Sequence, residues 1–362
     1  MSKIDLNDYM NQPDMKPIQI MDSKGNIVNE DLFPDLSDDQ LVELFKKMVW
    51  ERVLDERSTM LNRQGRLGFY APTAGEEASE MGSTYAMEKE DFLLPAYRDI
   101  PQWIQHGQPL YKAFLWSIGH YMGGQIEDDM QSATPQIVVA SATVQTAGVG
   151  LGLKKKGSSN VAYTYTGDGG TSEGDFYEGI NFAGEYKVPA LFIVQNNQYA
   201  ISVPRKHQTA AKTLAQKAVA VGIPGIQVDG MDALAVYAVT KAAREWAAAG
   251  NGPVVIETIT YRYGPHTLSG DDPRRYRTAD EEKYWHEKDP LIRFRTYLDH
   301  KKLWNEDMEK AWEAQVNKEI DEAIDKAEKA PKQKISDFYK LSYSETPDTI
   351  QDKIDECEKE GK

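Results

Sequence analysis

Between residues 160 and 264, short apolar runs alternate with longer amphipathic ones. The apolar runs have the length and composition of buried strands and cover residues 160–166, 190–197, 226–230 and 253–264. The segments between them, 174–187, 213–222 and 233–250, are typical of helices. Strands that are apolar on both faces belong to a parallel sheet covered by helices on both sides. The sequence therefore predicts an α/β fold, with a doubly wound, mostly parallel sheet and helices on both faces.

The flanking segments differ in character from this alternating region. Residues 1–36 are polar and interrupted by prolines, so we expect an extended arm that lies on a neighbouring chain or stays mobile. A capping box at Ser37 and Gln40 precedes apolar residues at helical spacing, and it predicts a helix near 38–64. From Leu291 onward the chain is charged and helical in pattern. We expect an arm over 1–36, one ligand-binding domain over 37–290 and a helical extension over 291–362.

Charge and cysteine content narrow the possible partners. The 362 residues include 42 Lys and Arg against 57 Asp and Glu, a net charge of −15, which argues against nucleic acid or an anionic membrane as partner. The single cysteine, Cys357, cannot form a disulfide within the chain, as expected for a reducing compartment. No apolar run approaches the roughly 20 residues that span a bilayer, and the N-terminus resembles no targeting peptide. We expect a cytoplasmic protein.

The run "GDGG" at 167–170 follows the first predicted strand, and "NN" at 196–197 ends the next one. In open α/β sheets, ligands bind beyond the carboxyl ends of the strands, where helix N-termini present free N–H groups to anions. Gly167, Gly169 and Gly170 permit positive φ and close approach of the backbone, which suits a phosphate. No P-loop pattern is present, and "GDGGTS" lacks the third glycine of the dinucleotide-binding fingerprint. A different kind of phosphate site is therefore expected.

A carboxylate at Asp168 would repel a phosphate unless a cation lay between them. Mg²⁺ prefers about six oxygen ligands, commonly from one or two side chains, phosphate groups and water. Asn197 follows the next strand and offers a neutral oxygen, and the backbone carbonyl of Tyr199 offers another. We therefore predict a Mg²⁺ site at Asp168, Asn197 and Tyr199. The alternative is that Asp168 and Asn197 are ordinary turn and cap residues.

The spacing of these two motifs resembles the thiamine-diphosphate motif, with 26 residues between "GDG" and "NN". The surrounding blocks narrow the resemblance: "GFYAPTAGEEAS", "LLPAYRD", "TYTGDGGTSEGDFYEGINFAG", "AKTLAQKAVAVGIPGIQVDGMD" and "YRYGPHTLSGDDPRRYR". Together, in this order, they resemble the alpha subunits of bacterial pyruvate dehydrogenases, the decarboxylating components of the 2-oxo acid dehydrogenase complexes. The likeness runs from about residue 40 to 300. It implies a thiamine-diphosphate-binding fold for residues 37–290.

Matched position by position, the resemblance implies roles for individual residues. The implied Mg²⁺ ligands are Asp168, Asn197 and the Tyr199 carbonyl. The implied contacts to the cofactor's diphosphate come from Tyr97, Arg98, the amides of Gly169 and Gly170, and Arg262. Arginine suits this role because its fixed donors form charge-assisted hydrogen bonds to phosphate.

The resemblance also implies where the reacting part of the cofactor lies. The backbone around Ile137 and Val139 falls where relatives meet the aminopyrimidine ring. His266, in "RYGPHTLSGDD", corresponds to the family's active-site histidine on a mobile loop. A histidine that titrates near neutrality can stabilise or protonate an oxyanion, so we predict His266 as the catalytic residue. The alternative is an ordinary surface histidine. The cofactor itself would provide the chemistry of decarboxylation.

The sequence contains one diphosphate motif, and residues 37–290 leave no room for a second full domain of the same kind. In this superfamily a second domain supplies the glutamate that activates the aminopyrimidine. The resemblance therefore implies a beta subunit, a two-alpha, two-beta heterotetramer, and a lipoyl-bearing dihydrolipoyl acetyltransferase as acceptor.

Two alternatives remain open at this point. The chain could belong to a branched-chain 2-oxo acid dehydrogenase or an acetoin dehydrogenase, since a methylene in the substrate is worth only about 1 to 3 kcal/mol. It could also be a non-catalytic scaffold whose glycines merely shape turns.

Overall fold

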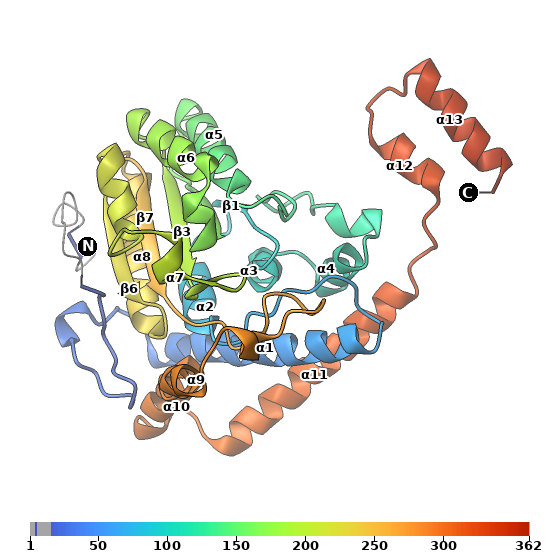
Figure 1. The fold of residues 1–362 in the computed structure, drawn as a ribbon. Coiled ribbons are helices and arrows are strands. Elements are labelled where there is room, and N and C mark those ends of the chain that lie inside the picture. Colours follow the sequence, from blue (N-terminus) through green and yellow to red (C-terminus); the bar gives the residue numbers. More distant parts are fainter. Residues whose placement is uncertain (1–3, 6–15, 362) are drawn as a thin grey trace.

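The structure, a computed structural model, describes residues 4–5 and 16–361. Within them, a sheet of five parallel strands in the order β1-β2-β3-β7-β6 forms the centre of the molecule (Figure 1). Its strands are β1 (Phe92–Leu94), β2 (Ala162–Gly167), β3 (Ala190–Asn196), β7 (Val254–Ile259) and β6 (Gly225–Asp229). A short antiparallel hairpin, β4 (Tyr199–Ala200) and β5 (Val203–Pro204), follows β3. The predicted α/β class with a parallel sheet is confirmed.

Helices surround the sheet and continue beyond it. The α-helices of the described residues are α1 (Asp38–Arg63), α2 (Glu77–Tyr85), α3 (Ile100–His106), α4 (Leu110–Ser117), α5 (Ser141–Lys155), α6 (Gly174–Glu185), α7 (Arg205–Gln208), α8 (Ala233–Ala248), α9 (Ala279–His286), α10 (Pro290–His300), α11 (Glu306–Glu328), α12 (Ile335–Leu341) and α13 (Asp348–Lys359). The 3-10 elements are η2 (Glu30–Leu32), η3 (Tyr121–Gly124), η4 (Gly169–Ser172), η5 (Ala215–Val221) and η6 (Pro273–Arg275). The expected helix over 213–222 is thus a tighter coil, which Gly222 ends with a φ of 70°.

Both faces of the sheet are buried, as a doubly wound fold requires. Along β3, alternate residues point to opposite faces. Leu191 and Ile193 belong to the core that α1, α2 and α8 share, whereas Phe192 and Val194 pack with residues of α5, α6 and η5. Burying side chains of this size stabilises the fold by about 1.5–3 kcal/mol each. This two-sided burial explains why β3 is apolar throughout its length up to Gln195.

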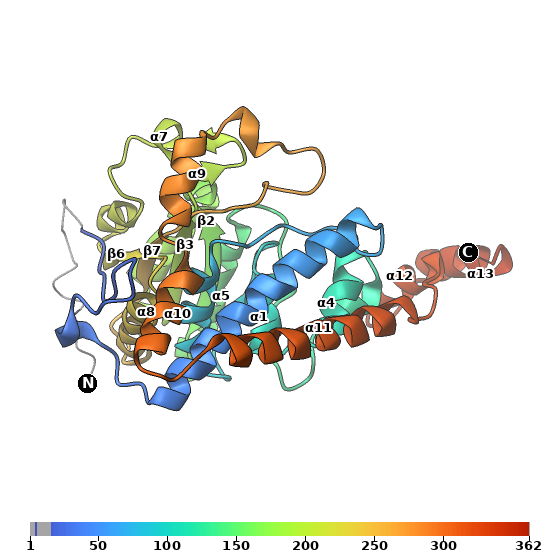
Figure 2. The same ribbon diagram turned by 90° about the horizontal axis from the view of Figure 1, so that it is seen from below.

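The long helix α1 begins as the sequence predicts. Ser37 Oγ accepts a hydrogen bond from the Gln40 N–H at 3.3 Å, and Gln40 Oε1 accepts one from the Ser37 N–H at 2.9 Å. Figure 2 shows α11 running beside α1. The buried ring of Phe45 contacts the rings of Phe294 and Trp304, with centroids 5.6 and 5.5 Å apart. The core therefore continues past residue 290, and the expected boundary at 290/291 falls inside α10.

The N-terminal segment over residues 16–36, expected to lie on a neighbouring chain or to stay mobile, packs on its own chain. Ile18 forms a parallel bridge with Val228, and the N–H groups of Ile20 and Met21 donate to Asp232 Oδ2 at 2.8 and 2.6 Å. The other oxygen of Asp232 caps the start of α8. The physical reason is that β6 would otherwise be an open edge strand. The rest of the expected arm, residues 1–3 and 6–15, lies outside the described residues.

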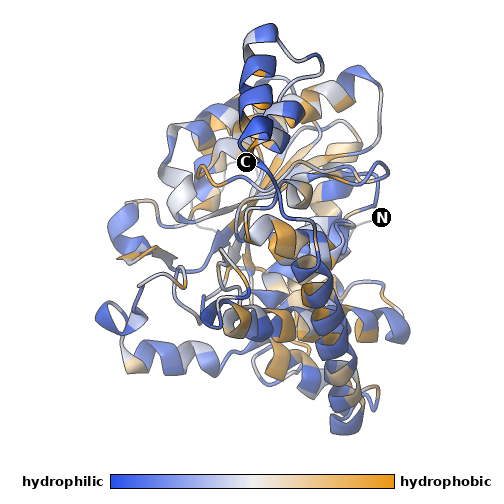
Figure 3. Cartoon of the chain, turned by 90° about the vertical axis from the view of Figure 1, so that its right-hand side faces the viewer, coloured by the Kyte–Doolittle hydropathy of each residue, from blue (hydrophilic) through white to orange (hydrophobic). Residues whose placement is uncertain are grey.

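At the other end of the chain, α12 and α13 form a helical pair that projects from the body (Figures 1 and 2). Ile354 of α13 is buried. Figure 3 shows the C-terminal end toward the viewer, with hydrophilic residues prevailing along it. Within the described residues, no helix combines the length and the apolar character that crossing a membrane requires.

Candidate functional site

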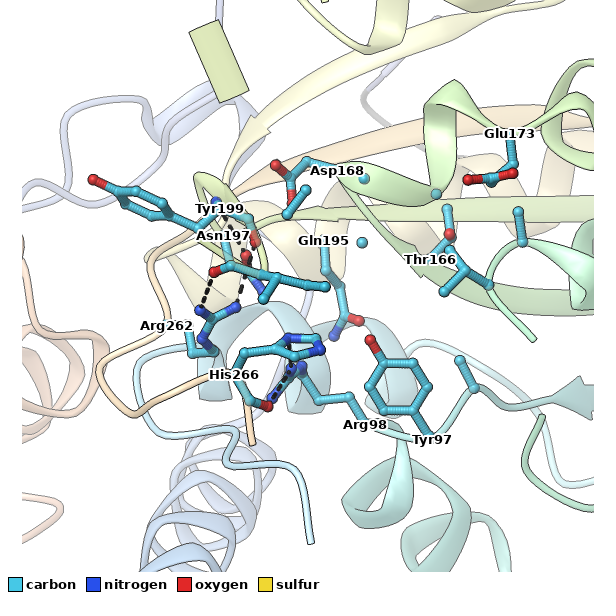
Figure 4. Close-up of a pocket in the computed structure, with 18 of the residues that line it drawn as sticks. Tyr97, Arg98, Thr166, Asp168, Glu173, Gln195, Asn197, Tyr199, Arg262 and His266 are labelled. Atoms are coloured by element: carbon cyan, nitrogen blue, oxygen red, sulfur yellow. Dashed lines mark hydrogen bonds between the residues drawn. The ribbon is translucent and has the colours of Figure 1, made fainter. Parts of the chain in front are cut away.

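A cavity of about 260 Å³ opens at the carboxyl edge of the sheet (Figure 4). Three residues that line it come directly or shortly after three neighbouring strands. Asp168 follows β2, Asn197 follows β3 and Arg262 follows β7. Parallel pairing places these strand ends side by side, as the sequence predicts for a ligand site. Every predicted site residue except Ile137 lines the cavity: Tyr97, Arg98, Val139, Asp168, Gly169, Gly170, Asn197, Tyr199, Arg262 and His266.

Oxygen atoms converge on one side of this cavity. Asp168 is 1% exposed, and its Oδ2 has no hydrogen-bond partner among the described residues. Burial raises the pKa of Asp168 to about 6, although the charge of Arg262 opposes this rise. Asn197 Oδ1 accepts a weak hydrogen bond from the Tyr199 N–H at 3.4 Å. An orphaned carboxylate oxygen beside neutral oxygens is what a hard cation requires.

The glycines of the turn are needed for space. A Cβ on Gly170 would lie 2.1 Å from Thr166 Oγ1, and one on Gly169 would lie 2.8 Å from the Ala200 Cβ. None of Gly167, Gly169 and Gly170 has a positive φ, so that part of the expectation is wrong. The turn follows the tight 3-10 geometry of η4, which needs no left-handed residue.

Two buried arginines line the cavity, and the buried carboxyl of Glu76 interacts electrostatically with both of them. Arg262 is 1% exposed and donates to the carbonyls of Tyr199 at 3.4 Å and Ile201 at 3.0 Å. Arg98 donates to the carbonyls of Pro72 and His266. In the described part of the chain, neither guanidinium hydrogen-bonds a carboxylate. Burial, with the charge of Arg98 adding to it, lowers the pKa of Arg262 to about 10. The pair could bind an anion in the cavity.

His266 lies against Arg98 at the cavity wall. Arg98 Nη2 lies 3.1 Å from His266 Nδ1, and because a guanidinium only donates, Nδ1 is the acceptor and Nε2 carries the proton. Burial and, after it, the charges of Arg98 and Arg262 together lower the pKa of His266 to about 4. The expectation of a histidine titrating near neutrality is therefore wrong for this arrangement. The Tyr97 ring meets the imidazole edge to face at 6.0 Å.

Comparison with known proteins places this site in a family. The model of the family described as "Dehydrogenase E1 component" matches residues 45–336, most of the chain. The chain belongs to the dehydrogenase E1 component family. This family is thiamine-diphosphate dependent.

Curated relatives of this E1 chain are similar over nearly its whole length. A Staphylococcus epidermidis protein named pyruvate dehydrogenase E1 component subunit alpha is 60% identical over 339 residues, covering 94% of this chain and 92% of the relative. A Staphylococcus aureus protein of the same name is 59% identical over 345 residues, covering 95% and 93%. The resemblance seen in the sequence blocks is thus confirmed at the level of the family.

The E1 chain carries an apolar stretch at the mouth of its cavity. Ile137, Val138 and Val139 are 58%, 68% and 45% exposed, and Ala140, which follows them, has a φ of 64°. Val139 lines the cavity, whereas Ile137 does not. The predicted role of this backbone at the aminopyrimidine stays a prediction.

Sequence reasoning missed two polar residues of this E1 site. Glu76, fully buried, accepts a hydrogen bond from Asn197 Nδ2 at 3.0 Å. Gln195 lines the cavity and donates to Glu80 Oε1 at 3.2 Å. The sequence offered a signal only for Gln195, a glutamine in the apolar run that ends in "QNN".

Proposed function

We propose that this chain is the alpha subunit of a pyruvate dehydrogenase (acetyl-transferring). With a beta subunit it would catalyse the oxidative decarboxylation of pyruvate and the reductive acetylation of a lipoyl group on a dihydrolipoyl acetyltransferase. The 59–60% identity to relatives that bear this name, over more than nine-tenths of both chains, supports the choice of pyruvate. The observation that carries the proposal is that one cavity holds a carboxylate oxygen without a hydrogen-bond partner and two buried arginines that hydrogen-bond no carboxylate, within the described residues.

The residues present fit a Mg²⁺ ion. Asp168 Oδ2 is buried without a partner, and a dication would compensate the charge that burial disfavours there. Asn197 Oδ1 and the Tyr199 carbonyl would add neutral oxygens. The Tyr199 carbonyl accepts one hydrogen bond from Arg262, but its second lone pair remains for a metal. Phosphate and water would complete the coordination.

The residues present also fit a diphosphate. Arg98 and Arg262 offer fixed donors, and Gly169 and Gly170 line the same cavity. The net charge of −15 would repel an anion, so this local positive charge is required to bind one. Thiamine diphosphate bound here would supply the electron sink for decarboxylation.

His266 would act on the substrate as a neutral hydrogen-bond donor. Arg98 holds Nδ1, so the N–H at Nε2 is free to stabilise an oxygen on which negative charge develops. Tyr97 packs against the ring and limits its rotation. These contacts orient the donor before substrate arrives, which avoids reorganisation during the reaction.

The beta subunit would complete the site in a two-alpha, two-beta assembly. The reconstituted assembly, with thiamine diphosphate and Mg²⁺, should acetylate a lipoyl domain from pyruvate, whereas this chain alone should show almost no turnover. The decisive comparison is the rate with pyruvate, 3-methyl-2-oxobutanoate and acetoin. A higher kcat/KM for either of the last two would overturn the substrate assignment, and full activity without a beta chain would overturn the shared site.

A further inference from the structure

Glu76 lies between the start of α2 and the cavity, and its side chain turns away from the helix it precedes. It occupies the N-cap position of α2 but makes no capping hydrogen bond. Instead, Oε1 accepts a hydrogen bond from Asn197 Nδ2 at 3.0 Å, while Oε2 has no partner within the described residues. A fully buried carboxylate costs free energy, so its position next to Asn197 calls for a functional explanation.

The chemistry of the two side chains makes this contact directional. The amide of asparagine has one accepting and one donating end, which are nearly equal in shape. A carboxylate only accepts, so Glu76 selects the orientation in which the NH₂ group faces it. Oδ1 of Asn197 then faces the opposite side, where it accepts the N–H of Tyr199.

The reversed orientation would be unfavourable at both ends. The amide oxygen would face the Glu76 carboxylate, and the NH₂ group would face both the Tyr199 N–H and the proposed cation. Glu76 and the Tyr199 N–H therefore select the same orientation of the Asn197 amide, and the Glu76 contact, at 3.0 Å, is the shorter of the two.

We propose that Glu76 is a positioning residue, which holds the Asn197 oxygen toward the Mg²⁺ site and so sets the affinity for Mg²⁺ without touching the ion. This inference rests on the metal site of the proposed function. Residues that orient a metal ligand typically change metal affinity by about 10- to 100-fold when they are replaced.

The test measures Mg²⁺ binding directly, in the assembled protein with its beta subunit and thiamine diphosphate. Calorimetric titration with Mg²⁺ should show a Kd about 10- to 100-fold higher for Glu76→Met than for the wild type. Glu76→Gln keeps an accepting oxygen but also permits the reversed pairing, so its Kd should lie between those of the wild type and Glu76→Met.

Saturating Mg²⁺ should restore most of the turnover of both Glu76 variants. Asp91→Asn, at a fully buried carboxylate that pairs with Arg244 and precedes β1 at the opposite, amino edge of the sheet, is the control and should leave the Kd unchanged.

A double-mutant cycle separates positioning from a general loss of structure. In an Asn197→Ala background, Glu76→Gln should no longer alter the Mg²⁺ affinity, because the amide it orients is gone. If Glu76→Met does not assemble, the Glu76→Gln series alone decides, and an unchanged Kd in that series overturns the inference. Asp168→Ala tests the metal site itself. If Asp168→Ala loses Mg²⁺ binding but the Glu76 variants keep the wild-type Mg²⁺ affinity, the inference about Glu76 is refuted and the proposed function still stands.

Discussion

Arg98 donates hydrogen bonds to two atoms of His266. Its Nη2 lies 3.1 Å from the Nδ1 and 3.1 Å from the main-chain carbonyl oxygen of the histidine. The two residues are 168 positions apart in the sequence. The contact fixes the tautomer, places a positive charge beside the ring and ties the loop that carries His266 to the loop after β1. The Asp271 carboxylate anchors the same loop by accepting the His266 N–H at 2.5 Å.

The pKa of His266 should therefore rise when Arg98 is replaced by methionine. In the wild type, burial and the two arginines lower this pKa to about 4, so the ring stays neutral down to about pH 5. Because the folded-state pKa is lower than the unfolded one, the contribution of His266 to the free energy of unfolding is fully present above about pH 6.5. This contribution decreases as the pH falls toward 4, since the unfolded chain binds the proton more readily. NMR titration of the histidine resonances, assigned with His266→Asn, measures the change. A pKa that stays unchanged in Arg98→Met would contradict this electrostatic account.

Replacing His266 by alanine should lower turnover by about 10² or more, because a positioned donor at the reacting oxygen is lost. The affinity for thiamine diphosphate should change little, since Arg98 and Arg262 remain. Steady-state kinetics with a lipoyl domain, alongside calorimetric titration of the cofactor, separate the two effects. His300→Ala, an exposed histidine at the end of α10, is the control. A loss of cofactor affinity as large as the loss of turnover would count against the assignment.

Asp168→Asn should weaken Mg²⁺-dependent binding of thiamine diphosphate by at least 10-fold, because it removes the one anionic ligand that the protein is proposed to give the ion. Without Mg²⁺, the same variant should bind the cofactor no worse than the wild type, since a buried negative charge near the diphosphate has been removed. Asp129→Asn, at an exposed ion pair with Lys89, serves as the control. Equal Mg²⁺ dependence in Asp168→Asn and the wild type is the result that would exclude this metal site.

Glu51→Gln should stabilise the protein, and more so at high pH. Both carboxyl oxygens of Glu51 lack a hydrogen-bond partner among the described residues, and burial raises its pKa well above the ordinary value. A raised carboxyl pKa means that stability decreases as the pH rises above about 4.5, by about 1.4 kcal/mol per pH unit for each proton involved. Denaturant unfolding at pH 5.5 and pH 8 measures the difference. If Glu51→Gln raises the free energy of unfolding by the same amount at pH 5.5 and at pH 8, the Glu51 carboxyl does not have the raised pKa described.

The sequence predicted the parts of the site that depend on local order along the chain. Asp168 and Asn197 each follow a strand, and parallel pairing of β2 and β3 brings such positions together at one edge. Glu76 was missed because its role depends on how the start of α2 packs against the end of β3, which no local pattern encodes. The neutral state of His266 was missed for the same reason, since the charges that set it come from two distant segments. Residues 16–36 were misjudged because polar composition conceals three buried side chains, Ile18, Ile20 and Met21.

Asp232 joins the N-terminal segment to the start of α8, and this has a practical consequence for producing the protein. One of its oxygens binds two main-chain N–H groups of the segment and the other caps the helix. Deleting the first 21 residues would leave a buried charge without two of its donors and would uncover the outer edge of β6. Shortened forms of the chain would then be prone to self-association through that edge and to precipitation on storage. Removing this polar segment to obtain a shorter protein would therefore make the protein less soluble.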